Sequence, residues 1–271
     1  DVYKRQTRDI EARLVPDGDG YRVSGRKFYS TGALFAHWIP TKVLDTEGRL
    51  VTVVLERGVP GVSVVDDWSS FGQRTTASGT VLLDNVRVEA GSILPAWLAQ
   101  QAPVLLGPFA QLMQAAIDAG IAEGALQYAV AFLRERSRPW VEANVERATQ
   151  DPYVIADVGQ LYIDLHAAQA LLTEAAQVLD DARGRTLDAD GVAAASIAVA
   201  RAKAVSTEVA LAASEKLFEL SGARASLAEF SLDRHWRNAR VHTLHDPVRW
   251  KYHAVGNYVL NGQRPNRHSW I

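Results

Sequence analysis

The stretch Gly25-Arg-Lys-Phe-Tyr-Ser-Thr-Gly-Ala-Leu-Phe-Ala-His-Trp38 places small hydroxyl side chains among aromatic ones, and a Gly turn follows a strand-like run. On a strand, Phe28 and Ser30 would project to one face and Tyr29 to the other, because successive side chains alternate. That face would give a flat ring an apolar surface beside a hydroxyl group. The stretch therefore predicts the wall of a ring-binding site, with an ordinary half-buried hairpin as the alternative.

The same stretch resembles the flavin-contacting segment of the acyl-CoA dehydrogenase superfamily, whose usual form is Gly-x-Lys-x-Trp-Ile-Thr-Asn-Gly. Phe28 stands at the Trp position and Ser30 at the Thr position. This variant is similar to the flavin-dependent monooxygenase branch, typified by dibenzothiophene monooxygenase. The resemblance implies that Phe28 contacts the flavin. It also implies that Ser30 lies beside flavin N5, as a cofactor-binding and a catalytic residue.

Residues from about 10 to 95 are typical of short strands separated by marked turns. The turns are Asp17-Gly-Asp-Gly20, Asp45-Thr-Glu-Gly48 and Val59-Pro-Gly61. This spacing predicts a compact antiparallel β-barrel or sandwich. The predicted strands are 13–15, 21–23, 27–30, 51–55, 62–65 and 80–88.

From about residue 103 the sequence becomes Ala-rich with helical periodicity, which predicts an antiparallel four-helix bundle. Asp151-Pro152 is an N-cap followed by Pro at the first helical position, and Gly184 and Gly222 stand where helices should stop. The last helix should break near Pro247. The predicted helices are 103–138, 152–184, 190–221 and 227–261.

These two regions predict an α+β protein with a β domain over 1–97 and a helical domain over 98–271. Helices of about 30 residues need partners beyond one small sheet, so we expect an oligomer rather than a monomeric bundle. The resemblance implies a homotetramer and a further helical domain before the strands. Because the chain opens Asp1-Val-Tyr-Lys-Arg-Gln6 without Met, we expect it to be N-terminally incomplete.

The loop Asp66-Asp-Trp-Ser-Ser-Phe-Gly-Gln-Arg-Thr-Thr-Ala-Ser-Gly79 is too polar for a strand interior. By its chemistry this loop binds something or caps something, and the alternative is a solvent-facing turn, because Ser, Thr and Gly clusters are common in loops. In the monooxygenase branch this segment lines the flavin and substrate pocket. The resemblance implies that Trp68 contacts both flavin and substrate, and that Arg74, Thr75 and Ser78 bind substrate.

The segment Leu133-Arg-Glu-Arg-Ser-Arg-Pro-Trp140 gathers arginines near a predicted helix C-terminus, where cations are favoured by the helix dipole. A solvated basic end is the alternative. The segment resembles the superfamily's Arg-x-Gln-Phe-Gly motif, whose Arg reaches a cofactor phosphate, usually across a subunit interface. Arg136 matches that cofactor-binding Arg. Arg138-Pro-Trp140 replaces Gln-Phe-Gly, which favours FMN over FAD.

The segment Asp233-Arg-His-Trp-Arg-Asn-Ala-Arg-Val-His-Thr-Leu-His-Asp-Pro247 is dense in functional groups, and His242 and His245 would share a face if both were helical. No acidic or thiol partner completes a metal motif, so proton chemistry or a structural pair of histidines is favoured over a metal site. The monooxygenase branch carries a His at this turn, whereas dehydrogenases carry a Gly-Thr turn beside their catalytic Glu. The resemblance implies that His245 is the catalytic proton carrier at the flavin, with His242 as a supporting substrate-binding residue.

Composition limits the other classes of function. A net charge of −2 leaves no excess of basic residues for nucleic acid, and no cysteine is present for disulfide or thiolate chemistry. No apolar run approaches the roughly 20 residues of a membrane span, and no signal-peptide pattern opens the chain, so we expect no membrane partner and a cytoplasmic location.

The leading hypothesis is the oxygenase component of a two-component flavin-dependent monooxygenase. It would oxygenate a small organic substrate, such as an organosulfur compound, with reduced FMN and O₂. Because the nucleotide-binding motif Gly-x-Gly-x-x-Gly is absent, a separate NAD(P)H:flavin reductase is the expected partner. The alternatives are an FAD-dependent acyl-CoA dehydrogenase and a non-catalytic helical assembly module. The His245 turn and the altered Arg136 motif favour the monooxygenase.

Overall fold

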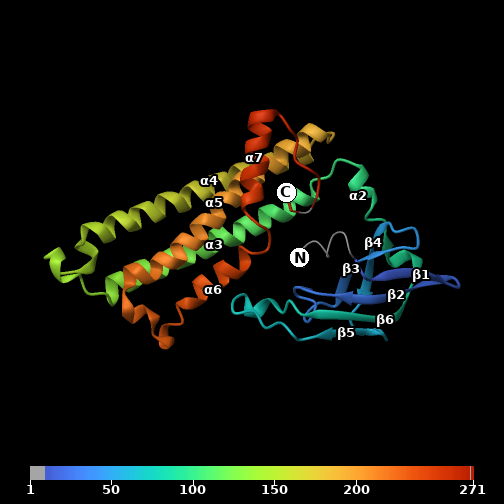
Figure 1. Cartoon of the computed structure of the whole chain (residues 1–271), viewed down its shortest axis with the longest axis horizontal. Helices are drawn as coiled ribbons and strands as arrows, with labels where there is room; N and C mark the ends of the chain where they lie inside the picture. Colours follow the sequence, from blue (N-terminus) through green and yellow to red (C-terminus); the bar gives the residue numbers. More distant parts are fainter. Residues whose placement is uncertain (1–9, 269) are drawn as a thin grey trace. The chain divides into compact units, whose positions relative to one another are not determined.

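The computed structural model describes residues 10–268 and 270–271, and the chain forms two compact units (Figure 1). One, the sheet unit, comprises Asp1–Ser70 and Arg74–Ala102, and the other, the helical unit, comprises Phe71–Gln73 and Pro103–Ile271. Residues 1–9 of the predicted first domain lie outside the described residues. The short segment Phe71–Gln73 thus belongs with the helices, although it lies within the strand region of the sequence.

The sheet unit is built on a 7-stranded sheet with the strand order β5-β6-β2-β1-β3-β4-β7. Neighbouring strands pair antiparallel except β1 and β3, which run parallel. The strands are β1 (Arg13–Asp17), β2 (Gly20–Lys27), β3 (Trp38–Leu44), β4 (Leu50–Glu56), β5 (Val62–Val65), β6 (Thr80–Val88) and β7 (Ile93–Leu94).

Of the predicted antiparallel barrel or sandwich, the barrel is wrong, because the sheet is mixed and open. Strands β5 and β7 stand at opposite ends of the order, and within the described residues no ladder joins them. The chain leaves β2 and returns as β3 on the far side of β1, so Arg13 of β1 pairs with Leu44 of β3 in parallel. This long-range crossover cannot be read from local turn signals.

Strand alternation explains the core of the sheet unit. In β4, residues Val51, Val53 and Leu55 are buried while their neighbours are more exposed, as a sheet with one covered face requires. Gly25 sits at a register irregularity of the β2–β6 ladder with a φ of 144°, and a Cβ there would lie 2.4 Å from Ala12 Cα. Only glycine allows that close approach of two backbones.

Strand β2 ends earlier than predicted. It stops at Lys27, and Tyr29 adopts a left-handed backbone with a φ of 53°. The prediction that 27–30 is a strand with Phe28 and Ser30 on one pleated face is therefore wrong, because the left-handed residue turns the chain between them. Phe28 is exposed and Ser30 is half-buried, and the segment is tied by backbone hydrogen bonds to residues 76–79.

Three long helices of the helical unit, α3, α4 and α5, run side by side in alternating directions (Figure 1). Two shorter helices, α6 and α7, pack on α5, and α6 also contacts α3. The predicted break near Pro247 is confirmed by the turn between α6 and α7. The helices are α2 (Leu98–Gln101), α3 (Leu106–Glu135), α4 (Pro152–Arg183), α5 (Ala189–Ser221), α6 (Asp233–His242) and α7 (Arg249–Asn261).

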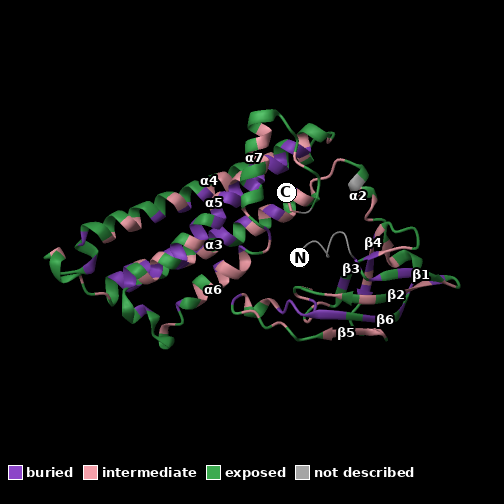
Figure 2. Ribbon diagram, in the orientation of Figure 1, coloured by how far each residue is buried: buried purple, intermediate pink, exposed green. Residues whose placement is uncertain are grey.

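Small residues let the long helices approach closely. Buried alanines line the facing sides of α3 and α5, among them Ala122, Ala125 and Ala213 (Figure 2). Among the described residues α3 is also the one helix long and apolar enough to cross a membrane, contrary to the expectation that no run would qualify. The buried alanines of α3 pack against α5, and α3 carries the fully buried side chain of Asp118.

The predicted helix boundaries are confirmed where a capping group defines them. Asp151 accepts hydrogen bonds from Tyr153 N and Val154 N at the start of α4, and Gly222 ends α5 with a φ of 76°. A left-handed residue at a helix end satisfies carbonyls that would otherwise lack partners.

Candidate functional site

A cluster of hydroxyl groups lies where the segment after β2 meets the segment before β6. Ser30 N donates to Gly79 O at 2.9 Å and Gly32 N donates to Thr76 O at 3.0 Å, which ties the two segments together. Ser78 Oγ then lies 2.8 Å from Thr31 Oγ1 and 2.7 Å from Thr76 Oγ1. The hydroxyl cluster is therefore formed by Thr31, Thr76 and Ser78, and the backbone of Ser30 is bonded to Gly79, the residue after Ser78.

Aromatic rings stand at the same segments. Phe28 is 44% exposed and Tyr29 is 50% exposed, although large apolar rings usually bury themselves. The rings of Tyr29 and Trp68 meet edge to face with centroids 6.0 Å apart. Next to Trp68, Asp67 accepts hydrogen bonds from Thr80 N and Thr80 Oγ1, and the Thr80 hydrogen bonds lower the pKa of Asp67. The carboxylate therefore holds the Trp68 segment against β6.

The other two predicted residues of loop 66–79 are more exposed to solvent. Arg74 and Thr75 are exposed in the short 3₁₀ turn Arg74–Thr76. The sheet unit therefore brings together Phe28, Ser30, Trp68 and Ser78, while Arg74 and Thr75 stand beside them on a surface turn. Their predicted roles in binding remain predictions.

In the helical unit, Arg136 caps the C-terminal end of α3, as the sequence indicates. Its guanidinium lies over the ring of Phe230 at 5.1 Å, and Arg224 lies 6.0 Å from the same ring. Arg136 is eighteen residues from Asp118 on α3, about 27 Å along a helix. Because His242 contacts Asp118, the fold of one chain does not bring Arg136 to the predicted histidines.

His242 is held inside the helical unit by a buried carboxylate. Its Nδ1 lies 2.5 Å from Asp118 Oδ1, and its side chain is 9% exposed. Asp118 Oδ2 lies 2.5 Å from Lys203 Nζ and accepts from Thr207 Oγ1 at 2.8 Å. Burial alone would raise the pKa of Asp118, but the hydrogen bond from His242 and the charge of Lys203 lower it. Asp118 is therefore ionised, and His242 Nδ1 must carry the hydrogen that it donates.

His242 Nε2 is buried and has no hydrogen-bond partner among the described residues. An unpartnered buried acceptor costs free energy, and such an atom is usually satisfied by a ligand or a water molecule. This observation supports, without testing, the prediction that His242 contacts substrate.

His245 lies outside the helix. Helix α6 ends at His242, and His245 N donates to His242 O at 3.0 Å in the turn that follows. The prediction that the two histidines share a helical face is therefore wrong, because the helix stops three residues before the Asp246-Pro247 pair. His245 is 43% exposed and its Nδ1 lies 3.1 Å from Asp246 Oδ1.

The segment Phe71–Gln73 rests on the start of α6. Phe71 stacks on Trp236 with centroids 6.0 Å apart, and its carbonyl accepts from Arg237 Nη1 at 2.9 Å. Gln73 N donates to Asn238 Oδ1 at 2.8 Å. These contacts hold the segment Phe71–Gln73, the middle of the polar loop 66–79, against α6.

The sequence interpretation missed the buried charges that hold the histidines. Asp118 and Lys203 each stand alone among alanines on a long helix, and Lys203 lies four residues from both Val199 and Thr207 on the buried stripe of α5. A single charge on an otherwise apolar helix face is the signal that could have identified them, because buried charges are nearly always paired. The residues missed in this way are Asp118, Lys203, Thr207, Asp246 and Lys251.

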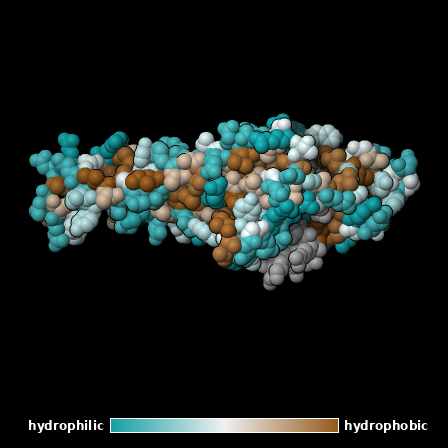
Figure 3. All heavy atoms as spheres, turned by 90° about the horizontal axis from the view of Figure 1, so that it is seen from above, coloured by the Kyte–Doolittle hydropathy of each residue, from teal (hydrophilic) through white to brown (hydrophobic). Residues whose placement is uncertain are grey.

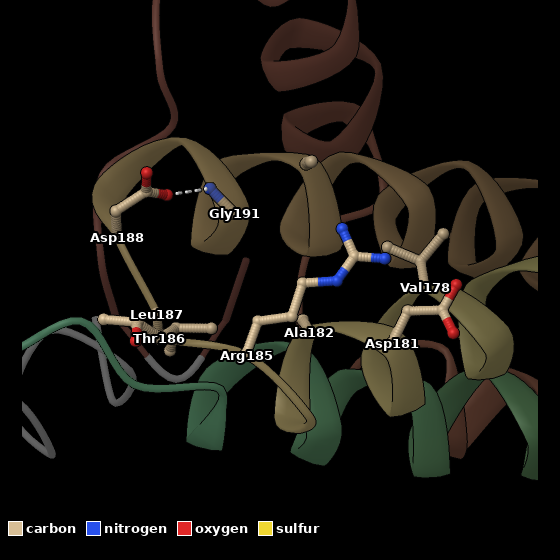
Figure 4. Close-up of a pocket in the computed structure, with 9 residues that line it drawn as sticks. Val178, Asp181, Ala182, Arg185, Thr186, Leu187, Asp188 and Gly191 are labelled. Carbon is tan, nitrogen blue, oxygen red and sulfur yellow. Dashed lines mark hydrogen bonds between the residues drawn. The ribbon is translucent and has the colours of Figure 1, made fainter.

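A depression of about 370 Å³ lies at the connection of α4 and α5, and it is lined by residues such as Asp181, Arg185 and Asp188 (Figure 4). The Asp188 carboxylate already caps α5 by accepting from Gly191 N at 2.7 Å. None of the predicted site residues lines this depression. Over the described residues, no group of three or more His, Asp or Glu side chains is arranged to hold a metal ion.

Comparison with known proteins identifies the relatives of this chain. The family described as "Acyl-CoA dehydrogenase, C-terminal domain" matches residues 112–250. Dibenzothiophene monooxygenase of Mycolicibacterium goodii is 38% identical over 94% of this chain and 65% of its own length. "Probable FMNH2-dependent monooxygenase SfnC" of Pseudomonas putida is 35% identical over 93% of this chain and 66% of its own length.

Solved structures give the same result. FMN-bound TdsC from Paenibacillus sp. A11-2 superposes with a TM-score of 0.93 at 33% identity, over 97% of this chain and 70% of that one. Methanesulfinate monooxygenase MsuC from Pseudomonas fluorescens superposes with a TM-score of 0.91 at 32% identity, over 98% of this chain and 70% of that one. The chain spans about 65% of the length of the curated relatives that it matches. It belongs to the acyl-CoA dehydrogenase family.

Proposed function

We propose that this protein is the oxygenase component of a two-component flavin-dependent monooxygenase. It uses reduced FMN and O₂ to oxygenate a small organic substrate, and an organosulfur compound is the first to test. The names of its relatives support this, since they include dibenzothiophene monooxygenase and an FMNH₂-dependent monooxygenase. Within the chain, the observation that carries the proposal is the surface of exposed rings and clustered hydroxyls at Phe28–Ser30 and Thr76–Ser78.

The residues of this surface fit the isoalloxazine ring of FMN. A flavin is flat and largely apolar, with hydrogen-bonding atoms along one edge, so it needs aromatic contact and nearby donors. Phe28 and Tyr29 are exposed rings, and Trp68 meets Tyr29 edge to face. Ser30 and the Ser78 cluster supply the hydroxyl groups. These residues would hold the ring, and reduced FMN would supply the electrons for the reaction with oxygen.

The residues of the chain provide hydrogen bonding and proton handling. Ser30 would donate a hydrogen bond to the flavin, and His245 would take up or release a proton during oxygenation, for which an imidazole is suited near neutral pH. His242, with its buried Nε2, would contact the substrate. Arg136 would pair with the FMN phosphate, and Arg74 and Thr75 with the substrate.

We infer that a separate NAD(P)H:flavin reductase delivers the reduced FMN, because a relative is described as FMNH₂-dependent. The protein would then work in the cytoplasm, where NAD(P)H is available. FMN is preferred to FAD in this proposal because Arg138-Pro-Trp140 replaces the segment that serves the dinucleotide in dehydrogenases.

A homotetramer is also proposed. Large apolar side chains stay exposed on the described helices, such as Tyr153 at 82%, Ile163 at 63% and Leu260 at 82%. Figure 3 shows apolar residues interrupting the polar surface along the helices. Exposed large apolar side chains support a subunit interface, and an interface would let Arg136 of one chain serve the flavin of another.

The test is an anaerobic titration of the protein with reduced FMN and reduced FAD, followed by turnover with O₂ and substrate. We expect tighter binding of FMN. Ser30→Ala should weaken coupling, since one hydrogen bond contributes about 1 kcal/mol, so more of the oxygen consumed is released as hydrogen peroxide. Tighter binding of FAD together with acyl-CoA oxidation would instead show a dehydrogenase, and unchanged coupling in the variant would remove Ser30 from the site.

A further inference from the structure

The turn between α6 and α7 contains a chain of three side chains. Asp246 Oδ1 lies 3.1 Å from His245 Nδ1, and Asp246 Oδ2 lies 2.9 Å from Lys251 Nζ. Asp246 is 4% exposed and Lys251 is 1% exposed, whereas His245 is 43% exposed. Lys251 Nζ also donates to the carbonyl of Trp270. The surface imidazole is therefore attached to a buried, anchored ion pair.

The charge state of Asp246 decides which imidazole nitrogen carries hydrogen. Burial would raise the pKa of Asp246, but the His245 hydrogen bond and the charges of Lys251 and Lys203 lower it to about 2. The carboxylate is then ionised near neutral pH and can only accept hydrogen bonds. His245 Nδ1 must be the donor, so any proton exchanged by the neutral ring passes through Nε2.

Asp246 acts on an imidazole that lies in a turn rather than on a helix. Helix α6 ends at His242, and His245 follows it before Pro247. An imidazole can adopt two neutral tautomers, and a hydrogen bond from Nδ1 to a carboxylate favours the Nδ1–H form. Asp246 is a firm partner for this bond because it is itself buried and lies 2.9 Å from Lys251 Nζ.

We propose that Asp246 is a positioning residue for His245, which it holds in the Nδ1–H tautomer with Nε2 as the proton-exchanging atom, and that Lys251 anchors Asp246. The consequence for turnover rests on the proposed function, but the tautomer does not. Asp118 and His242 form a second pair of this kind deeper in the helical unit, and Lys203 acts electrostatically on both carboxylates.

The tautomer can be measured in the protein labelled with ¹⁵N-histidine, by solid-state NMR, with His245→Gln used to assign the signal. We expect the wild type to show the Nδ1–H form at His245 and Asp246→Asn to show a tautomer mixture. Asp118→Asn is the matched control, since it also removes a buried carboxylate near Lys203 but contacts His242. It should leave the His245 signal unchanged.

A variant that keeps Lys251 without its partner leaves a buried unpaired charge and can fail to fold. The double variant Asp246→Asn/Lys251→Met removes both charges and keeps the test possible. It should show the same tautomer mixture as the single variant. An Nδ1–H signal that persists in a folded protein lacking Asp246 overturns the proposal.

The second readout is product formed per O₂ consumed, with reduced FMN supplied. Loss of a positioned proton carrier typically costs 10²–10⁴-fold, and we expect a loss of roughly 10²-fold in turnover with FMN affinity within about threefold of wild type. A changed tautomer with unchanged turnover overturns the positioning role. If the wild type itself does not oxygenate substrate, the proposed function fails, and with it any role of Asp246 in that reaction. This result is distinguishable from a failure of the positioning role, because it appears without a substitution.

Discussion

At the scale of single residues, the helical unit buries several charged side chains, and nearly all of them lie in ion pairs. Asp118, Lys203 and Lys251 are each at most 1% exposed, and each lies within ion-pair distance of an opposite charge. Such pairs contribute little net stability compared with apolar residues of the same shape, but breaking one of them is costly. Their presence beside both predicted histidines therefore indicates a role in holding those rings.

His235 is a half-buried titratable group whose Nε2 has no hydrogen-bond partner among the described residues, and it makes the free energy of unfolding depend on pH. Burial and the nearby Arg234 lower the pKa of His235 from 6.5 to about 4. Between those values the unfolded chain binds the proton and the folded chain does not. Stability is therefore present above pH 6.5 and is lost as pH falls towards 4.

We predict that His235→Phe reduces this acid-induced loss by roughly 1–3 kcal/mol, discounted because the ring is not fully buried. The ring packs against Tyr128 with centroids 4.9 Å apart, so an aromatic replacement keeps the contact. The measurement is urea unfolding followed by far-UV circular dichroism at neutral and acidic pH. As a control, the substitution His253→Phe at an exposed position should leave the pH dependence of the free energy of unfolding unchanged. Equal curves for both variants would show that His235 is not the group responsible.

Gly72 is the residue that allows the loop 66–79 to rest on α6. A Cβ at this position would lie 2.0 Å from Arg237 O and 2.4 Å from Arg237 C, so backbone would have to move. Gly72→Ala should destabilise the protein by about 1–3 kcal/mol, as overpacking does. Gly91→Ala is the control, because a Cβ there meets nothing within 4 Å. Equal melting temperatures for the two variants would contradict the close packing at Gly72.

At the scale of elements, local chemistry fixes the helix ends. We predict that Asp151→Ala lowers stability by about 1 kcal/mol, because the carboxylate accepts from Tyr153 N at 2.9 Å at the start of α4. Asp164→Ala, in the interior of the same helix, should cost little, since the gain in helix propensity offsets the lost hydrogen bond from Gln160. Thermal unfolding compares the two. A loss for Asp164→Ala as large as that for Asp151→Ala would contradict the capping role of Asp151.

These capping and turn signals are also what made much of the fold predictable from sequence. Asp151-Pro152, Gly222 and the Asp17–Gly20 hairpin each act within a few residues, and the structure confirms all of them. The left-handed Tyr29 was not predicted, because a bulky residue rarely has positive φ and nothing in its neighbours indicates it. The parallel pairing of β1 with β3 was missed because it depends on a crossover rather than on a turn.

The candidate site was predictable only in the residues that the family resemblance covers. The family resemblance predicted Ser30, Trp68 and His245 as site residues. The structure describes all three residues, and their roles remain predictions. Asp118 was missed because its partners Lys203 and His242 lie 85 and 124 residues away. Pairing over such separations is fixed by helix packing, which a single sequence does not display.

At the scale of the whole molecule, we propose that a dehydrogenase-type scaffold has been adapted to oxygenate substrate. In this proposal the exposed rings and hydroxyls of the sheet unit would contact the flavin. The helical unit contains two histidines that each contact a buried carboxylate. In a dehydrogenase of this family the substrate is oxidised at the flavin, whereas in an oxygenase the reduced flavin reacts with O₂. The origin of the oxygen atom in the product separates the two chemistries.

The most direct test is turnover of the full-length protein under ¹⁸O₂, with reduced FMN supplied by a separate NAD(P)H:flavin reductase and dibenzothiophene as the probe substrate. The product is analysed by mass spectrometry, and hydrogen peroxide is measured in parallel. If the protein is a monooxygenase, we expect each new oxygen atom in the product to come from O₂. We also expect His245→Ala to divert most of the oxygen consumed to hydrogen peroxide. Oxygen drawn only from water, or quantitative peroxide release by the wild type across organosulfur and aromatic substrates, would contradict the proposed function.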